Sequence, residues 1–344
     1  MRNFVKKMWS DVVLGVLFVV SGFVKAVDLV GFSYKIEEYL GMFQLSSWRE
    51  FSVSFSVLLC VAEMTLGMLL LLRLWRRVTA VTVTLFILGF TILTYLIYID
   101  PYGGINECGC FGEAKAIHLS NGATFAKNIL LLVVAGIHSW NVFRQAKNNF
   151  NYRQIGLTIG VLVMAFFVPL YSYFYLPPFD FLPYNVGTKI EAKNVVRLYD
   201  SGFNDVTETV FVGGKPTYMI GLKEKITPEK SGKLAALHEE YEKGKINLFV
   251  ATSQGGIAIP GCSDVPVYFM DNVMLKSILR TAAGVVAFAN GRIVGKWNLL
   301  YTPYRFDGGY GEELSGERWK RGAFFGVLLV MGVLLFYGRK KMEE

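Results

Sequence analysis

The chain lacks the features of a nucleic-acid-binding protein, although it is basic. Its formal net charge is +8, but no stripe of Lys and Arg interleaved with aromatic residues runs along it to follow a phosphate backbone. The basic residues gather instead at the ends of apolar runs, which is the pattern that orients membrane helices. We therefore expect no nucleic-acid partner and a lipid bilayer as the surroundings.

Cysteine is scarce, with four residues in 344, and no two of them form a Cys-x-x-Cys pair. Cys108 and Cys110 are separated only by Gly109 and are followed by Phe111 and Gly112. Two thiols this close favour redox chemistry, a soft metal site or a simple loop staple. Cys60 lies in an apolar run and suits packing, whereas Cys262 stands alone in a polar stretch and its role is open.

Apolar residues make up 53% of the chain, and six runs are long enough for a helix that crosses the hydrocarbon core. The expected spans are Asp11 to Val27, Phe51 to Leu72, Val78 to Ile99, Phe125 to Phe143, Ile155 to Leu176 and, barely long enough, Gly322 to Gly338. An alternative for the first run is a signal peptide, since Val24-Lys25-Ala26 loosely fits a cleavage site.

Clusters of Lys and Arg set the expected orientation, because positive loops stay in the cytoplasm. Four clusters fall on one side of six spans: Arg2, Lys6 and Lys7; Arg73, Arg76 and Arg77; Arg144, Lys147 and Arg153; and Arg339, Lys340 and Lys341. Both termini are therefore expected in the cytoplasm of a bacterium, in a multi-pass protein of the inner membrane. The loop with Cys108 and Cys110, and the polar stretch from Pro177 to Lys320, then face the periplasm, where disulfides persist.

The polar stretch after Pro177-Pro178 is long enough to form a separate α/β domain. Its periodicity predicts strands and helices in the order of a thioredoxin-like fold, with Asn290-Gly291 as a strong hairpin turn. The expected strands are Val195 to Tyr199, Thr209 to Val212, Pro216 to Gly221, Ile246 to Thr252, Gly284 to Ala289 and Arg292 to Asn298, and the expected helices are Pro228 to Lys243 and Val273 to Arg280.

Several of these residues carry a resemblance to a known family. In the N-terminal half these are Leu14-Gly15, Phe18, Ser21-Gly22, Lys25, Asp28, Glu63, Gly67 and the Cys-Gly-Cys-Phe-Gly run at 108–112. With these positions the N-terminal half resembles the DoxX-like and MauE-type (methylamine utilisation) family of four-helix membrane proteins. The run from Phe179 to Tyr184 with Gly187-Thr188, and the tail from Leu275 to Trp297, resemble fused members from Bacteroidetes that carry a thioredoxin-like domain.

The resemblance implies a domain plan and a role. Residues 1–148 would form a four-helix membrane domain, 149–178 a fifth span, 179–320 a periplasmic thioredoxin-like domain, and 321–344 a last span with a cytoplasmic tail. MauE-type proteins are thought to support disulfide formation or electron delivery outside the membrane. A periplasmic or secreted protein substrate is the implied partner.

The outer domain departs from active thioredoxins. The region from Leu222 to Pro228, where a helix would begin, holds no cysteine whose thiolate the helix N-terminus would stabilise. Ala282-Ala283 stands where active members have a cis-proline. We expect this domain to bind or position a protein rather than to exchange electrons.

The redox work would then belong to Cys108 and Cys110, which makes the chain a candidate thiol-disulfide oxidoreductase. A disulfide between residues two apart requires a tight bend, which Gly109 permits, and strained exposed disulfides are more oxidising. The candidate electron acceptor is a quinone. Two alternatives stay open. One is a non-catalytic membrane scaffold whose outer thioredoxin-like domain docks an envelope or secreted protein while the pair staples the loop, and the other is a Cu(I) or zinc site that includes His118.

Glu63 and Lys25 are the supporting candidates. A carboxylate in mid-span is costly and therefore paired or functional, so Glu63 either bonds to Ser, Thr or Lys25 within the bundle or transfers protons during thiol oxidation. Lys25 is predicted to form an interfacial ion pair with Asp28, three residues on. His138, near the inner end of the fourth span, is expected to pack or to reach the interface.

Overall fold

The computed structural model describes residues 2–99, 120–145, 152–180, 182–190, 196–211, 215–226, 232–257, 259–299 and 310–343. The chain divides into two compact units. The helical unit comprises Met1–Ser172 and Phe325–Glu344, and the sheet unit comprises Tyr173–Phe324. The predicted Cys108–Gly112 loop and His118 lie outside the described residues.

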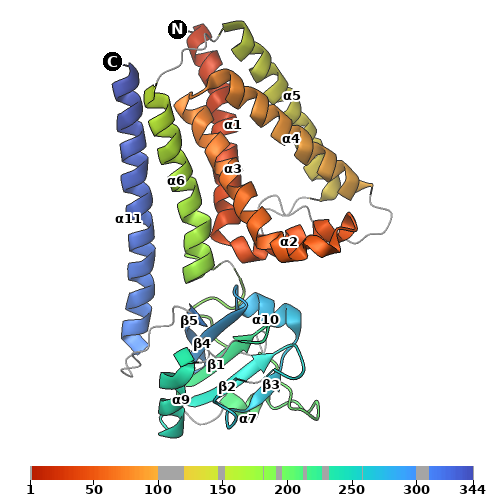
Figure 1. Cartoon of the computed structure of the whole chain (residues 1–344), viewed down its shortest axis with the longest axis vertical. Helices are drawn as coiled ribbons and strands as arrows, with labels where there is room; N and C mark the ends of the chain where they lie inside the picture. Colours follow the sequence, from red (N-terminus) through yellow and green to blue (C-terminus); the bar gives the residue numbers. More distant parts are fainter. Residues whose placement is uncertain are drawn as a thin grey trace. The chain divides into compact units, whose positions relative to one another are not determined.

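The helical unit is a bundle of long apolar helices (Figure 1). Its helices, two of which continue into the sheet unit, are α1 (Arg2–Val27), α2 (Leu29–Met42), α3 (Ser52–Leu72), α4 (Arg76–Tyr98), α5 (Asn121–Gln145), α6 (Tyr152–Tyr175) and α11 (Tyr310–Glu343), with a 3-10 turn at Ser46–Phe51. Within the described residues, α1, α3, α4, α5 and α6 are long and apolar enough to cross a membrane. The prediction of a multi-pass membrane protein is thus confirmed, while the apolar part of α11, Arg321–Tyr337, falls below that length.

Helix α2 has no counterpart among the predicted spans. Asp28 separates it from α1 and caps it, because the Asp28 side chain accepts a hydrogen bond from the Gly31 backbone N–H at 3.0 Å. Figure 1 shows α2 lying across the end of the bundle rather than along it. The chain therefore turns sharply between the first two spans.

Glycines bring α1 and α3 into close contact. A Cβ atom added to Gly67 would lie 2.7 Å from both the Gly15 carbonyl oxygen and the Val19 backbone nitrogen. A Cβ atom on Gly22 would lie 2.9 Å from the Glu63 Cβ. Small residues of this kind let membrane helices pack backbone to backbone.

Hydroxyl and amide groups join α4 to α5. The Thr84 and Ser139 hydroxyls lie 2.8 Å apart, and the Asn128 amide donates to the Thr94 hydroxyl at 3.1 Å. Such bonds between helices hold a bundle together where lipid provides no hydrophobic driving force.

The sheet unit contains a mixed five-stranded sheet. Its strands are β1 (Thr217–Leu222), β2 (Asn247–Thr252), β3 (Val267–Phe269), β4 (Ala283–Ala289) and β5 (Arg292–Asn298), in the order β3-β2-β1-β4-β5. Strands β1, β2 and β3 are parallel neighbours, β4 is antiparallel to β1, and β5 is antiparallel to β4. The unit's short helices are α7 (Thr207–Phe211), α9 (Ala235–Glu242) and α10 (Asn272–Ile278), with a 3-10 turn at Gly232–Leu234.

Both faces of this sheet are covered. Leu237 of α9 packs in the core on one face with Ile220 and Val250, and Leu275 of α10 packs in the core on the other with Met219 and Phe249. Every residue of β1 and β4 is therefore buried, which explains why these strands are continuous apolar runs.

The β4–β5 hairpin confirms the turn predicted from Asn290-Gly291. Both residues have positive φ, 49° and 68°, as a two-residue hairpin turn of the primed type requires. Before the sheet, Asp180 forms an ion pair with Lys296 of β5 at 2.6 Å, which fixes the preceding segment to the sheet edge.

Two strand predictions are wrong and one strand was not predicted. Thr209 to Phe211 lies in α7, because the Asp205 carboxylate accepts from the Thr207 backbone N–H at 3.0 Å and starts a helix despite the β-branched residues. In the predicted strand from Val195 to Tyr199, Tyr199 pairs only through isolated bridges. Strand β3 is only three residues long, too short for a periodicity signal.

Substitution of Gly67 by Ala tests the close contact of α1 and α3. The added methyl group meets backbone atoms that cannot rotate away, so we expect a loss of about 1–3 kcal/mol in stability. Thermal unfolding in detergent measures it. The matched controls are Gly89→Ala and Gly136→Ala, where a Cβ meets nothing within 4 Å and where Ala favours the helix. Equal effects at all three glycines would contradict the packing described.

Candidate functional site

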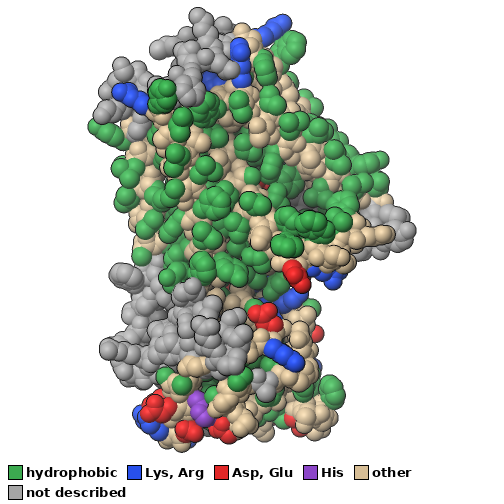
Figure 2. Space-filling view, viewed as in Figure 1, with side chains coloured by type: hydrophobic (Ala, Val, Ile, Leu, Met, Phe, Trp, Pro, Cys, Tyr) green, Lys and Arg blue, Asp and Glu red, His purple; other side chains and the backbone are tan. Residues whose placement is uncertain are grey.

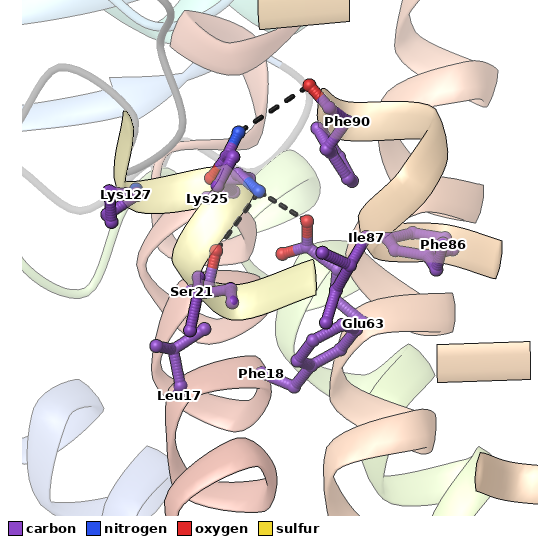
Figure 3. A pocket seen from close by; sticks show the side chains of 11 residues that line it. Leu17, Phe18, Ser21, Lys25, Glu63, Phe86, Ile87, Phe90 and Lys127 are labelled. Carbon is purple, nitrogen blue, oxygen red and sulfur yellow. Dashed lines mark hydrogen bonds and ion pairs between the residues drawn. The ribbon is translucent and has the colours of Figure 1, made fainter. Parts of the chain in front are cut away.

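A cavity of about 50 Å³ lies among α1, α3, α4 and α5, with room for several water molecules (Figure 3). Its apolar lining consists of Leu17, Phe18, Phe86, Ile87, Phe90 and Leu131, and its polar lining consists of Ser21, Lys25, Glu63, Lys127 and Asn128. Apolar walls with a few convergent polar groups are typical of ligand sites.

The centre of the site is an ion pair between α1 and α3. The Lys25 Nζ lies 2.5 Å from the Glu63 Oε1 and donates to the Ser21 hydroxyl at 3.2 Å. Lys25 is 1% exposed and Glu63 is 3% exposed. The predicted pair of Lys25 with Asp28 is wrong: Lys25 turns into the bundle, and Asp28 caps α2.

Local sequence explains how the two charges meet. Gly22 lies one turn before Lys25 and allows the backbone of α3 to approach at Glu63, while Ser21 is four residues before Lys25 and shares its face. The Lys25 Nζ also lies 5.5 Å from the ring centre of Phe32 and 5.1 Å from that of Phe90. Both rings interact favourably with the ammonium group.

One oxygen of the pair remains unsatisfied. Glu63 Oε2 is buried and has no hydrogen-bond partner among the described residues, although Glu63 lines the cavity. Leaving a buried charged acceptor without a donor costs several times the free energy that a formed hydrogen bond contributes. Such a group is suited to accept a hydrogen bond or a proton from a molecule in the cavity.

Helix α5 adds two polar residues that the sequence analysis missed. Asn128 donates to the Thr94 hydroxyl at 3.1 Å and to the Phe90 carbonyl at 3.5 Å, and Lys127 beside it lines the cavity. With Lys25 and Glu63 the cavity carries two formal positive charges and one negative charge. The available signal was a Lys and an Asn within an otherwise apolar span, where polar residues are rare.

A second buried charge cluster lies at the Arg73 end of α3. Asp11 accepts from the Arg73 Nε at 3.0 Å and lies 3.4 Å from the His138 Nε2, while the Ser10 hydroxyl is 2.9 Å from the His138 Nδ1. His138 therefore joins α1 and α5 through these contacts, which goes beyond the packing role that we expected. We interpret the cluster as structural because both Asp11 oxygens are engaged.

The cavity lies toward the two helix ends, at Tyr98 of α4 and Asn121 of α5, that the predicted loop with Cys108 and Cys110 connects in the sequence. This loop follows α4 and precedes α5. Phe90 and Asn128 lie about two helical turns, or about 10–12 Å at 1.5 Å per residue, from the ends of α4 and α5 that the loop joins. In the described part, Cys60 and Cys262 are buried free thiols.

The fold and the site define a helical multi-pass membrane protein with an additional mixed-sheet unit. Residues 6–141 match a family model described as methylamine utilisation protein MauE, which supports a MauE-type membrane region. The match covers less than half of the 344 residues and includes Lys25, Glu63, Cys108 and Cys110. No curated protein and no solved structure matches the chain.

Substitutions in the ion pair test whether the two charges depend on each other. Lys25→Met or Glu63→Leu alone leaves a buried charge unpaired, so each should cost about 3–5 kcal/mol, whereas the double variant should recover much of this loss. Unfolding in detergent provides the free energies for a double-mutant cycle.

The control is the Lys35–Glu38 pair, which is joined at 2.9 Å and has the Glu38 side chain 44% exposed. Lys35→Met should cost about 1 kcal/mol or less. Additive losses in the Lys25 and Glu63 variants would show that the two side chains are not coupled.

Proposed function

We propose that this chain is a MauE-type membrane protein that supports thiol-disulfide redox chemistry on the outer side of a bacterial inner membrane. Cys108 and Cys110 are the exchanging thiols, and the cavity at Lys25 and Glu63 receives the electron acceptor. The observation that carries the proposal is the buried Lys25–Glu63 ion pair, which lines a cavity and leaves Glu63 Oε2 without a hydrogen-bond partner among the described residues. The name of the matched family connects this role to methylamine utilisation systems.

The proposed reaction has two halves. In the first, a thiolate of a partner protein attacks one sulfur of the Cys108–Cys110 disulfide, and the other loop sulfur leaves as a thiolate. A second partner thiolate then attacks the mixed disulfide, so the partner leaves oxidised and the loop is left as a dithiol. In the second half, the loop dithiol returns to the disulfide and loses two electrons and two protons, which convert a quinone to a quinol.

The chemistry of the cavity supports a quinone as acceptor. A quinone is a flat apolar ring with two carbonyl oxygens. The cavity of about 50 Å³ has room for a carbonyl end of such a ring, and it offers aromatic walls with Lys127 as a nitrogen donor. A quinol instead presents hydroxyl groups, for which Glu63 Oε2 is an acceptor without a partner within the described residues. Lys127 and Glu63 thus provide a group for each redox form, and Glu63 is the proposed group that takes up and releases protons.

The sheet unit is proposed to be a thioredoxin-like domain that docks the partner protein. The order β2-β1-β4-β5, with β1 and β2 parallel, β4 and β5 antiparallel, and helices on both faces, supports this fold. No cysteine occurs between β1 and α9 in the sequence, so the domain has no thiol pair of its own at that position. Both termini are proposed to be cytoplasmic, with the sheet unit and the loop outside.

Trapping of a mixed disulfide tests the proposal in cells. If Cys108 and Cys110 exchange with a partner, Cys110→Ala or Cys108→Ala leaves the mixed disulfide without its second thiol, and the protein should run as a reducible adduct on gels. The matched controls are Cys60→Ala and Cys262→Ala, which remove buried thiols and should trap nothing.

The same experiment separates the redox role from a scaffold role. A scaffold in which the pair only staples the loop yields no adduct from either variant, and both variants keep their activity in the cell. That pair of results would refute the redox proposal.

A further inference from the structure

One side-chain cluster in the sheet unit is unrelated to the cavity in the helical unit. His238 and Glu242 lie four residues apart on α9 and therefore share a face, and Asp264 comes from the segment between β2 and β3. The His238 Nε2 lies 2.7 Å from the Asp264 Oδ1, and the His238 Nδ1 lies 3.9 Å from the Glu242 Oε1. Figure 2 shows a histidine with acidic side chains beside it on the surface of this unit.

The charges of this cluster are not balanced within the described residues. The neighbouring lysines pair with other carboxylates: Lys243 pairs with Glu239 and Glu240, and Lys245 also pairs with Glu240. Glu242 and Asp264 thus form ion pairs only with His238 in the described part of the chain. The site is negative unless a cation binds.

We propose that His238, Glu242 and Asp264 bind a divalent zinc ion. One ligand atom from each residue lies within 4.8 Å of the other two, zinc binds both His nitrogen and carboxylate oxygen, and three protein ligands leave its fourth position open. Two ligands at zinc distances of about 2.0–2.2 Å are roughly 3.3–3.5 Å apart. When zinc binds, the His238 and Asp264 side chains therefore move slightly apart, and the exposed Glu242 side chain moves toward the ion. Zinc bound here joins α9 to the segment after β2.

Zinc titration of the full-length protein in detergent tests this site. Cys108→Ser/Cys110→Ser serves as the background, because cysteine thiolates bind zinc and would compete with the site. After treatment with a chelator, calorimetry with Zn²⁺ alone should show one equivalent bound. His238→Gln and Asp264→Asn should each weaken this binding by about 10-fold to 100-fold or more. Glu239→Gln, on the same helix but paired with Lys243, should leave it unchanged.

Thermal unfolding gives the second readout. Zinc should raise the unfolding temperature of the background protein and of Glu239→Gln, but not that of His238→Gln or Asp264→Asn. The site is refuted if the background protein binds no zinc, or if the two ligand variants bind as tightly as Glu239→Gln. The outcome is independent of the proposed redox function, which the background substitutions remove.

Discussion

The ion pair between Lys25 and Glu63 is the interaction on which the helical unit depends. Two charges with exposures of 1% and 3% are stable only as a close pair, because each alone would carry a large desolvation cost. The pair in turn requires α1 and α3 to meet backbone to backbone, which Gly15, Gly22 and Gly67 allow. The rings of Phe32 and Phe90 close over the ammonium group, so α2 and α4 are also drawn to this point. The pairing leaves Glu63 Oε2 without a hydrogen-bond partner among the described residues, so a residue that lines the cavity carries an unused acceptor.

The sequence predicted those parts of the fold that depend on local patterns. Apolar runs located the long helices within a few residues, and Asn290-Gly291 located the hairpin of the sheet. Helix α2 was not predicted because it is too short and too polar for a span. The strand expected at Thr209 is a capped helix in the structure. Glu63 attracted attention because a carboxylate in a span is costly, and a bond to Lys25 inside the bundle was one of its expected roles, but Lys25 itself was expected to pair with Asp28. Asp28 is near Lys25 in sequence, whereas Glu63 is 38 residues away and meets it only through helix packing.

The two units divide the chemistry between them. The helical unit contains buried charges whose positions are fixed by packing, including the cluster at Asp11, which is fully engaged, and the pair at Glu63, which is not. The sheet unit has an apolar core on both faces, and its unbalanced charges lie at the surface. The proposed functions follow this division, with proton and electron transfer assigned to the helical unit and partner or zinc binding assigned to the sheet unit.

Quinone reduction by the purified protein tests the central claim most directly. Protein with reduced Cys108 and Cys110 is mixed with a short-chain quinone, and the quinone absorbance and the thiol content are followed together. The account predicts that one quinone is reduced for each loop disulfide formed. It also predicts that the reaction is at least roughly tenfold slower in Glu63→Gln than in the surface control Glu38→Gln, which is the loss expected for a group that transfers protons. Quinone that stays oxidised, or equal rates in Glu63→Gln and Glu38→Gln, would contradict the account.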